Sequence, residues 1–424
     1  MKQSQLFTRT RKEAPADETS KNAELLIRGG FINKEMAGVY DFLPLGLMVL
    51  NKITGIIREE IDAIGGQEVF MSSLQRKELW EKTGRWNNDV WFKTSLKEDT
   101  ESDGNRSGEK GLAFTHEEPL TNMMEQFIPS YKDLPKYVYQ FQTKFRNEVR
   151  AKNGIMRTRE FIMKDLYSFD LDEKSHLEFY ERAKKAYQRI FQRAGIGHLT
   201  YLTFASGGAF SKFSHEFQTL TSAGEDTIYI NESKGIAVNK EVFNAEVLRN
   251  LGIEEKDLVE RKAVEVGNIF TLGTRFSDAL NCKYVTESGE KKSVFMGSYG
   301  IGPARLMGTV VEALSDDKGI IWPESIAPFL VHLLSLGEDE NVIKEANKIY
   351  EVLIEKNIEV LFDDRGAISP GEKFADADLI GMPYRAVVSL RSMKENGIEI
   401  KKRSEEKGRV VSIDELLTLL KHSA

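Results

Sequence analysis

The stretch FRNEVRAKNGIMRTREF, residues Phe145–Phe161, has the pattern of a charged β-hairpin around which the other motifs of the chain are arranged. Alternating residues suited to strands flank Asn153-Gly154, a dipeptide that supplies the positive backbone angles of a tight turn. Guanidinium groups bind phosphate oxygens through paired hydrogen bonds, and Glu148, two residues after Arg146, can accept a hydrogen bond from an amino group on the same strand face. The basic residues of the hairpin are Arg146, Arg150, Lys152, Arg157 and Arg159. The stretch indicates a nucleotide site, with an exposed charged hairpin as the equally favoured alternative.

The composition is that of a globular protein of two or three domains, with 424 residues, 41% hydrophobic and 29% charged. The net charge of −7 excludes a general nucleic-acid binder, so that any such contact must come from a local basic patch. Cys282 is the single cysteine, which excludes a disulfide framework and a cysteine-rich zinc site. No apolar run reaches transmembrane length and the first residues lack the apolar core of a signal peptide, so we expect no membrane association and a cytoplasmic location.

Upstream of the hairpin, the chain begins with a polar segment up to about Ser20, for which we expect a flexible arm. Apolar residues at helical spacing over 49–61 predict a helix that Gly65-Gly66 end, and a strand follows. Closer to the hairpin, the sequence THEEP precedes a predicted helix, and Thr115 and Glu117 would share one face of an extended segment. Helix capping by this Thr-x-x-Glu pattern is the alternative explanation.

Downstream, VFMGSYGIGPARLM (residues 294–307) predicts a strand, a glycine-rich turn and a helix. Gly300 and Gly302 would let the backbone approach a ligand, and Arg305 near the helix start can reach a phosphate. The pattern is not a P-loop, because no Gly-Lys-Ser/Thr follows. Prolines within 320–329 predict a domain boundary, beyond which strands alternate with helices in the pattern of a small α/β domain with a largely parallel sheet.

FRNE followed by a turn and RTREF resembles motif 2 of the class II aminoacyl-tRNA synthetases. By that resemblance, Arg146 holds the α-phosphate of ATP, Glu148 reads the adenine amino group and Phe161 stacks on the adenine ring. The stretch 294–307 resembles motif 3, whose Arg305 would reach the γ-phosphate. The helix and strand over 38–75 resemble motif 1, the dimer-forming element, although Ser72-Ser73 stand where that family usually has proline.

THEE, YQFQTKFRNEVR and SHEF together resemble the prolyl-tRNA synthetases. A carboxylate suits proline, whose secondary ammonium presents two N–H donors. The resemblance implies that proline is bound by Thr115, Glu117, Arg146, His215 and Ser298. It implies that ATP is bound by Arg146, Glu148, Arg157, Phe161, Gln218, Gly300, Gly302 and Arg305, with Arg146 and Arg305 as the catalytic residues. The chain departs from the usual family residues at Ala205, Asn268 and Thr271.

The resemblance also implies the fold class and the domains. An α+β catalytic domain on an antiparallel sheet would span 1–325, and an α/β anticodon-binding domain would span 326–424. The predicted motifs lie at about 38–75 (motif 1), 141–169 (motif 2) and 294–312 (motif 3). Arg150 and Lys152 would contact the acceptor end of tRNA. The candidates for anticodon contact are Asp363, Asp364, Arg365 and Lys373.

By the same resemblance, the chain activates L-proline with ATP and Mg²⁺ and transfers the prolyl group to the 3′ end of tRNA(Pro), as a homodimer. No structural metal is expected, and Glu216 is the only candidate we name as a magnesium ligand. Many bacterial members carry an editing domain between motifs 2 and 3. The interval of about 225–262 is shorter than the roughly 50 residues of an independent domain, so we expect no hydrolysis of alanyl-tRNA(Pro).

Three other functions are disfavoured by the sequence. An enzyme that adenylates a small molecule or loads a carrier protein would lack the α/β domain of the anticodon-binding type. A catalytically inactive relative acting as a regulator would be expected to lose Arg146, Glu148 or Arg305, and all three are present. A threonyl-tRNA synthetase needs a cysteine–histidine zinc site, which Cys282 in its context does not suggest.

Overall fold

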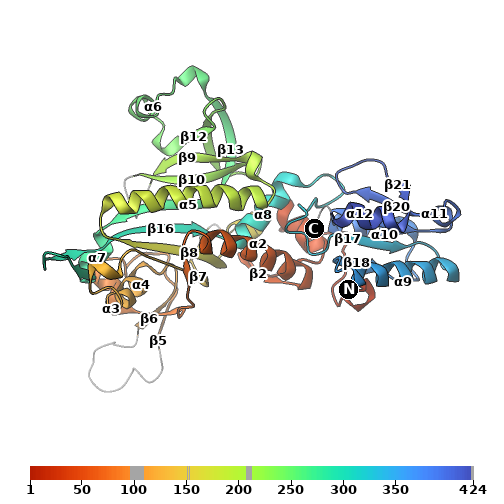
Figure 1. Ribbon diagram of the computed structural model, residues 1–424, viewed down its shortest axis with the longest axis horizontal. Helices are drawn as coiled ribbons and strands as arrows, with labels where there is room; N and C mark the ends of the chain where they lie inside the picture. The colour runs from red at the N-terminus through yellow and green to blue at the C-terminus, as the bar shows by residue number, and fades with distance from the viewer. Residues whose placement is uncertain (96–108, 150, 152, 207–212, 422–424) are drawn as a thin grey trace. The chain divides into compact units, whose positions relative to one another are not determined.

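The computed structural model describes residues 1–95, 109–149, 151, 153–206 and 213–421. Its contacts divide the chain into two compact units (Figure 1). The terminal unit consists of Met1–Met36, Tyr40–Gly55 and Val310–Ala424, and the sheet unit consists of Ala37–Val39 and Ile56–Thr309. This division differs from the predicted boundary at 325/326, because the N-terminal segments pack together with the C-terminal part of the chain.

The centre of the sheet unit is a nine-stranded sheet in the order β10-β9-β12-β11-β13-β16-β8-β7-β3. Only the pairs β12–β9 and β3–β7 are parallel, so the predicted antiparallel sheet is confirmed. The strands are β3 (Gln67–Glu68), β7 (Lys136–Phe145), β8 (Glu160–Asp170), β9 (Thr200–Ser206), β10 (Phe213–Leu220), β11 (Asp226–Asn231), β12 (Ile236–Asn239), β13 (Val259–Gly273) and β16 (Phe295–Ile301).

Strands β7 and β8 form the predicted hairpin. They pair without a register break from Lys136 opposite Phe169 to Phe145 opposite Glu160. Between them, Asn153 and Gly154 have φ of 66° and 60°, the left-handed conformation that short polar residues and glycine adopt with least strain. The positive backbone angles predicted at this dipeptide are confirmed, but the strands predicted to flank it directly are not, because β7 ends at Phe145 and β8 begins only at Glu160.

One face of the sheet is covered by the long helix α5 (Glu173–Arg193), which Figure 1 shows lying along the strands. Asp172 and Ser175 form a reciprocal capping box that fixes the helix start. The helix buries an apolar stripe at helical spacing against the sheet. Its members are Phe179, Ala183, Tyr187, Ile190 and Phe191. The opposite face of the sheet is thereby left for a ligand pocket.

A smaller sheet with the order β4-β6-β5 packs with helix α3, which in turn contacts helix α4 (Glu117–Met124). Its core contains the side chains of Leu79, Trp80, Trp86, Trp91 and Phe114. The remaining elements of the sheet unit are β4 (Leu74–Arg76), α3 (Lys77–Lys82), β5 (Lys93–Ser95), β6 (Glu109–Leu112), α6 (Ala245–Leu251), α7 (Arg275–Ala279), β14 (Lys283–Val285) and β15 (Lys291–Ser293).

The terminal unit contains a five-stranded sheet in the order β18-β17-β19-β20-β21, in which β18, β17 and β19 are parallel. The predicted alternation of strands and helices is thus confirmed. Its strands are β17 (Val331–Ser335), β18 (Val360–Asp363), β19 (Tyr384–Val388), β20 (Ile398–Lys402) and β21 (Arg409–Val411), and its helices are α9 (Glu340–Glu355), α10 (Pro370–Ile380), α11 (Leu390–Lys394) and α12 (Ile413–Lys421). The N-terminal part contributes α1 (Lys21–Arg28), β1 (Ile32–Met36) and β2 (Val39–Phe42), while α2 (Pro44–Asp62) and α8 (Pro303–Leu314) each begin in one unit and end in the other.

The N-terminal segment is anchored rather than flexible. Lys2 forms a parallel bridge with Phe362, and the Phe362 N–H donates to the Met1 carbonyl at 2.9 Å. The segment therefore covers the free edge of β18, which would otherwise expose unpaired backbone groups.

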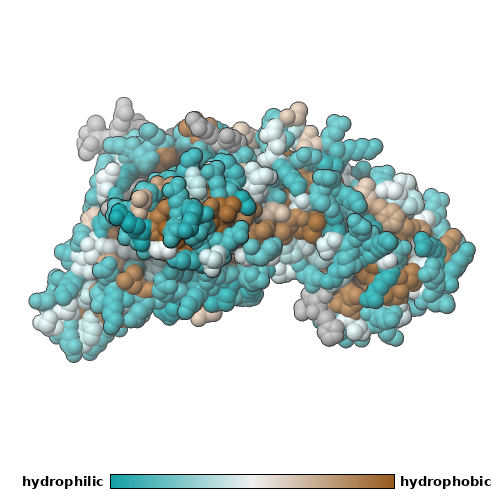
Figure 2. Space-filling view, turned by 90° about the horizontal axis from the view of Figure 1, so that it is seen from above, coloured by the Kyte–Doolittle hydropathy of each residue, from teal (hydrophilic) through white to brown (hydrophobic). Residues whose placement is uncertain are grey.

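Hydrophilic residues dominate the face seen in Figure 2, and hydrophobic residues appear there in separate patches. Some large apolar side chains are exposed, among them Phe70 (82%) and Phe7 (77%). Within the part of the chain that the structure describes, none of the helices is both long and apolar enough to cross a membrane.

Candidate functional site

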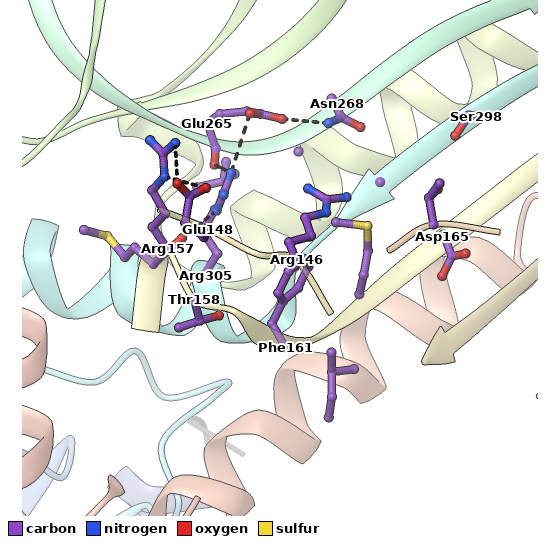
Figure 3. A pocket seen from close by; sticks show the side chains of 18 of the residues that line it. Arg146, Glu148, Arg157, Thr158, Phe161, Asp165, Glu265, Asn268, Ser298 and Arg305 are labelled. Carbon is purple, nitrogen blue, oxygen red and sulfur yellow. Dashed lines mark hydrogen bonds and ion pairs between the residues drawn. The ribbon is translucent and has the colours of Figure 1, made fainter. Parts of the chain in front are cut away.

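A pocket opens on the face of the main sheet opposite α5, over strands β8, β13 and β16 and beside Arg146, which follows the end of β7. Side chains from the hairpin and from the predicted motif 3 meet there. The lining includes Thr115, Glu117, Arg146, Glu148, Met156, Arg157, Phe161, Met163, Asp165, Tyr167, Glu265, Asn268, Phe270, Ser298, Gly300, Gly302 and Arg305. Figure 3 shows Arg157, Glu148, Arg305 and Glu265 gathered at one end, Ser298 and Asp165 toward the other, and Arg146 between them.

Arg146 extends into the middle of the pocket. Its Nε and Nη2 both donate to the Phe114 carbonyl at 3.3 Å, and its guanidinium carbon lies 5.2 Å from the centre of the Phe161 ring. Burial, and then the positive charge of Arg305, lower the pKa of Arg146. Within the described residues, no carboxylate pairs with this guanidinium, so its positive charge is available to an anion.

Two further arginines lie at the end that we call the acidic end, where each is paired with carboxylates. Arg157 Nε lies 3.1 Å from Glu148 Oε2, and its Nη1 lies 2.6 Å from Glu225 Oε2. Arg305 Nε donates to the Met156 carbonyl at 2.9 Å, and its Nη1 lies 3.5 Å from Glu265 Oε2. These side chains keep 24–39% of their surface exposed, so solvent weakens the pairs.

At the opposite end, which we call the buried end, Glu117 stands at the start of α4 with 2% exposure. Thr115 Oγ1 donates to Glu117 Oε2 at 2.6 Å, and the Tyr167 hydroxyl lies 3.3 Å from Glu117 Oε1. Ser298 on β16 pairs with Tyr167 on β8 and lines the same end. Thr115 therefore orients the carboxylate, and the capping alternative is set aside because no side-chain cap is formed at the start of α4.

Arg85 is a site residue that the sequence did not reveal. Its Nη1 lies 3.3 Å from Glu117 Oε2 and 3.0 Å from Glu118 Oε1, and its side chain is 8% exposed. Its guanidinium carbon lies 5.1–5.2 Å from the ring centres of Trp80, Phe114 and Phe276. Burial raises the pKa of Glu118 to about 7, while Arg85 opposes this rise. The only sequence signal was an arginine set among aromatic residues in LWEKTGRW.

Behind the buried end lies a second buried charge network. Lys144 Nζ lies 2.8 Å from Asp165 Oδ1 and 2.8 Å from His116 Nδ1. Burial and the charge of Lys144 lower the pKa of His116 to about 4, so the imidazole is neutral at pH 7. Its Nδ1 can then accept from Lys144, and its Nε2–H donates to the Ser72 carbonyl at 3.1 Å. Ser72, where the family usually has proline, thus accepts from a buried histidine through its carbonyl.

His215 does not reach the pocket lining. It lies on the face of β10 that α5 covers, and its Nδ1 is 2.8 Å from the Tyr180 hydroxyl. Burial lowers its pKa to about 4. Its contact with proline stays a prediction, and the residue has the surroundings of a structural hydrogen-bond partner.

Gln218 lies on the opposite face of β10 from His215, together with Glu216. Gln218 Nε2 donates to Glu216 Oε2 at 2.9 Å and to Asp226 Oδ2 at 2.8 Å. Gln218 is fully buried, and within the described residues its Oε1 has no hydrogen-bond partner. Burial, and then Glu265, raise the pKa of Glu216 to about 8, and burial raises that of Asp226. Across the described ranges, no three His, Cys, Asp or Glu side chains are grouped closely enough to form a metal site.

Two departures from the family pattern have local explanations. Asn268 Nδ2 donates to Glu265 Oε1 at 2.7 Å, which helps to fix the carboxylate next to Arg305. Thr271 Oγ1 lies 2.9 Å from His176 Nε2 on the α5 side of the sheet. Ala205 is buried on β9, opposite Ser214.

The predicted tRNA contacts fall in two places. Arg150 and Lys152, predicted at the acceptor end, lie outside the described residues. In the terminal unit, Asp363 is fully buried and pairs with Arg365 at 2.6 Å, and Lys373 is 2% exposed with Nζ donating to the Ser335 carbonyl at 2.7 Å. Asp364 accepts from the Ser4 hydroxyl at 2.7 Å. The roles of these four residues at the anticodon stay predictions.

Two family models match the chain. Residues 93–314 match the tRNA synthetase class II core domain (G, H, P, S and T), and residues 330–423 match an anticodon binding domain. The chain is 38% identical over 432 residues to a proline--tRNA ligase of the Wolbachia strain of Brugia malayi, covering 98% of this chain and 99% of the relative. It is 35% identical over 567 aligned positions to a proline--tRNA ligase of Persephonella marina, covering 98% and 99%.

A solved structure shares the fold. The crystal structure of a prolyl-tRNA synthetase from Cryptosporidium parvum, complexed with L-proline and AMP, matches with a TM-score of 0.74 at 18% identity. The match covers 94% of this chain and 74% of that one.

Proposed function

Because the chain belongs to the prolyl-tRNA synthetase family of class II tRNA synthetases, we propose that its pocket binds ATP and L-proline side by side and joins them as prolyl-adenylate. Membership of this family assigns to the chain the ligase reaction with proline and tRNA as substrates. The proposal concerns the residues that perform it. Arg146 carries the proposal, because it lies between the two ends of the pocket without a carboxylate partner in the described residues.

In the first step, an oxygen of the proline carboxylate attacks the α-phosphorus of ATP and pyrophosphate leaves. In the second step, a hydroxyl of the terminal ribose of tRNA attacks the prolyl carbonyl and AMP leaves. Arg146 is suited to the first step, since a guanidinium can hold the α-phosphate and stabilise the negative charge that develops there. Most of the rate then comes from holding the two reactants in line and from neutralising charge.

The acidic end is proposed as the ATP end. Glu148 would accept from the adenine amino group, and Phe161 would cover the ring. Arg157 and Arg305 would bind phosphate oxygens in place of their present carboxylate partners, Glu225 and Glu265. Gly300 and Gly302 support this assignment, because both line the pocket and Gly300 leaves no room for a Cβ, which would lie 2.8 Å from Asn268 Oδ1.

The buried end is proposed as the proline end. Glu117 would accept the two N–H groups of the secondary ammonium, with Thr115 and Arg85 holding its carboxylate in place. Tyr167, Phe270 and Ser298 line the remaining space. The end is enclosed, with 1–9% exposure for these three residues, which suits a small apolar ring.

Mg²⁺ would add positive charge next to the phosphates when bound. Carboxylates and amide oxygens are the ligands it prefers, and Glu216, Glu265 and Gln218 Oε1 supply that chemistry beside the acidic end. The raised pKa of Glu216 fits this role, because a nearby cation would relieve the repulsion between buried carboxylates. These three residues are the proposed candidates for the ion, although no three acidic or histidine side chains of the described residues form a preformed metal site.

Editing of mischarged tRNA is proposed to be absent. The segment that connects β10 to β13 contains only β11, β12, α6 and short turns around a small core. The alignment with the Persephonella relative extends over 567 positions, so that relative carries chain that this protein of 424 residues lacks. Alanine is smaller than proline, and each missing methylene is worth only about 1–3 kcal/mol of discrimination. We therefore propose that some alanyl-tRNA(Pro) forms and that a separate protein clears it.

We further propose a cytoplasmic homodimer that contacts the acceptor end of tRNA(Pro) through the hairpin tip. The anticodon-binding domain within the terminal unit would contact the anticodon loop.

Pyrophosphate exchange tests the proposal. Purified protein is incubated with ATP, labelled pyrophosphate and each amino acid in turn, and label entering ATP is counted. Proline should give the fastest exchange and alanine a slower one. Exchange that depends equally on many amino acids would overturn the assignment of the buried end. Adding alanyl-tRNA(Pro) in a second assay should give hydrolysis at the spontaneous rate, and faster hydrolysis would reveal an editing site.

A further inference from the structure

The N-terminal arm, residues Lys2–Lys12, begins along the free edge of β18, where Lys2 pairs with Phe362, and then passes the carboxyl end of that strand at Asp364. Gln3 Oε1 accepts from His332 on β17 at 2.9 Å, and Ser4 donates through its backbone N–H and its hydroxyl to the two oxygens of Asp364, just after β18. Thr10 Oγ1 donates to Asp376 on α10 at 2.7 Å. These contacts fix the course of the arm across the edge where open α/β sheets bind their ligands.

The anchoring contacts leave other side chains of the arm facing outward. Phe7, between the anchors at Ser4 and Thr10, is 77% exposed. Arg9, Arg11 and Lys12 are also exposed, and no carboxylate in the described residues pairs with them. An aromatic ring among unpaired cations on an anchored backbone is a combination that binds single-stranded nucleic acid.

The carboxylates around this edge are already engaged in hydrogen bonds or ion pairs. Asp364 and Asp376 accept from the arm itself, and Asp363 pairs with Arg365 and Lys373. Farther along the arm, Asp17 and Glu18 both pair with Lys34 at 2.6 Å. Within 2–13, Lys2, Arg9, Arg11 and Lys12 outnumber the single carboxylate, Glu13, so this stretch keeps a net positive charge that attracts a phosphate backbone.

We propose that the arm is part of the surface that receives the anticodon loop of tRNA, with Phe7 as a stacking platform for an unpaired base. Arg9, Arg11 and Lys12 contact the phosphates on either side of that base. This inference rests on the proposed function, because it assigns a further contact to the same tRNA. It gives a role to residues that precede the family-model matches at 93–314 and 330–423.

The first test is Phe7→Ala in the full-length protein. One stacked base is worth about 1–3 kcal/mol, so the KM for tRNA(Pro) in aminoacylation should rise about tenfold. The matched control is Phe127→Ala, which removes a phenylalanine that is 60% exposed in the sheet unit and should leave this KM unchanged. A KM for tRNA equal to that of the control would overturn the stacking role.

The second test is the pair Arg9→Gln and Arg11→Gln. Each single-strand phosphate contact contributes about 0.7 to the slope of log affinity against log salt, so the double variant should lower the slope by about 1.4. Lys348→Gln on α9, whose side chain is 69% exposed, is the charge control. An unchanged slope would exclude phosphate contacts by these arginines.

Two readouts separate this inference from neighbouring explanations. Proline-dependent pyrophosphate exchange should be unchanged in every arm variant. A wild-type protein without this exchange would instead refute the proposed function. Charging of a minihelix that carries only the acceptor stem should also be unchanged. Equal losses on the minihelix and the full tRNA, or a shift in subunit association with unchanged tRNA affinity, would overturn the arm as an anticodon contact.

Discussion

The two ends of the pocket are built in opposite ways. At the buried end, Glu117, Tyr167 and Arg85 are 1–8% exposed, and Thr115 and Arg85 fix the carboxylate of Glu117. At the acidic end, Arg157 and Arg305 are 36–39% exposed and paired with carboxylates. By the proposed assignment, the buried end is organised before proline arrives, whereas the arginines of the acidic end would exchange their carboxylate partners for phosphates. Selectivity for a small amino acid favours the first design, and binding and release of a larger charged nucleotide favour the second.

The largest effect on stability is expected from Arg85→Met, which tests whether the buried end is held together by its ionic cluster. Removing one partner of a buried ionic cluster leaves Glu117 and Glu118 without their counter-ion, which costs about 3–5 kcal/mol of folding free energy. Urea unfolding measures this loss, with Arg76→Met, an exposed arginine of the same unit, as the control. Equal unfolding free energies for the two variants would show that the buried end is not held by Arg85.

Arg146→Ala should act on the reaction rather than on the fold. Loss of one charged contact to the reacting phosphate costs about 3 kcal/mol, so proline activation should slow by more than a hundredfold. Arg305→Ala should have a similar effect on activation. Pyrophosphate exchange measures both rates, and thermal unfolding checks that each variant stays folded. Near-normal exchange in a folded variant would remove that arginine from the mechanism.

Glu118→Gln should change how the stability of the buried end depends on pH. The folded-state pKa of Glu118, about 7, lies above its ordinary value of 4.5, so the folded protein binds the proton more tightly than the unfolded chain. This contribution to stability is fully present below pH 4.5 and is lost as pH rises through 7. The wild type should therefore lose stability relative to Glu118→Gln between pH 5 and 8 in urea unfolding. A constant difference across that range would contradict the raised pKa.

The smallest effect is expected from Glu225→Gln at the acidic end. The pair with Arg157 is partly exposed, so its loss should change stability by about 0–1 kcal/mol. Freeing Arg157 from a competing carboxylate should lower the KM for ATP by about twofold to fivefold. The KM for ATP in pyrophosphate exchange measures this, with the exposed Glu254→Gln as the control. A raised KM for ATP would mean that Glu225 positions Arg157 for the nucleotide.

The contrast also explains what the sequence could reveal. The hairpin turn at Asn153-Gly154 and the glycines of the predicted motif 3 follow from local conformational rules, and the structure places both hairpin and motif at one pocket. Of the charges at the acidic end, Glu148, Arg157 and Arg305 stand on these segments and are predicted from the sequence, whereas Glu225 and Glu265 lie elsewhere and are not. The pocket brings together Thr115, Glu117, Arg146 and Ser298, although their roles toward proline stay predictions.

The parts that escaped prediction depend on contacts between distant residues. Arg85 meets Glu117 only because α3 and α4 pack together, and Lys144 meets His116 and Asp165 only in the folded sheet unit. The N-terminal arm was expected to be flexible, since its polar composition carries no periodic pattern. Its anchors, Asp364 and Asp376, lie hundreds of residues away and cannot be read from local sequence.

The position of β16 between β8 and β13 has a consequence for the newborn chain. The β7–β8 hairpin is complete when Asp170 has been synthesised, but its partner strand begins only at Phe295. At about 5–20 residues per second, one edge of β8 waits on the order of ten seconds with its backbone groups unpaired. That interval is when the nascent protein is most exposed to aggregation, and a chaperone that shields a bare strand edge on the ribosome would act there.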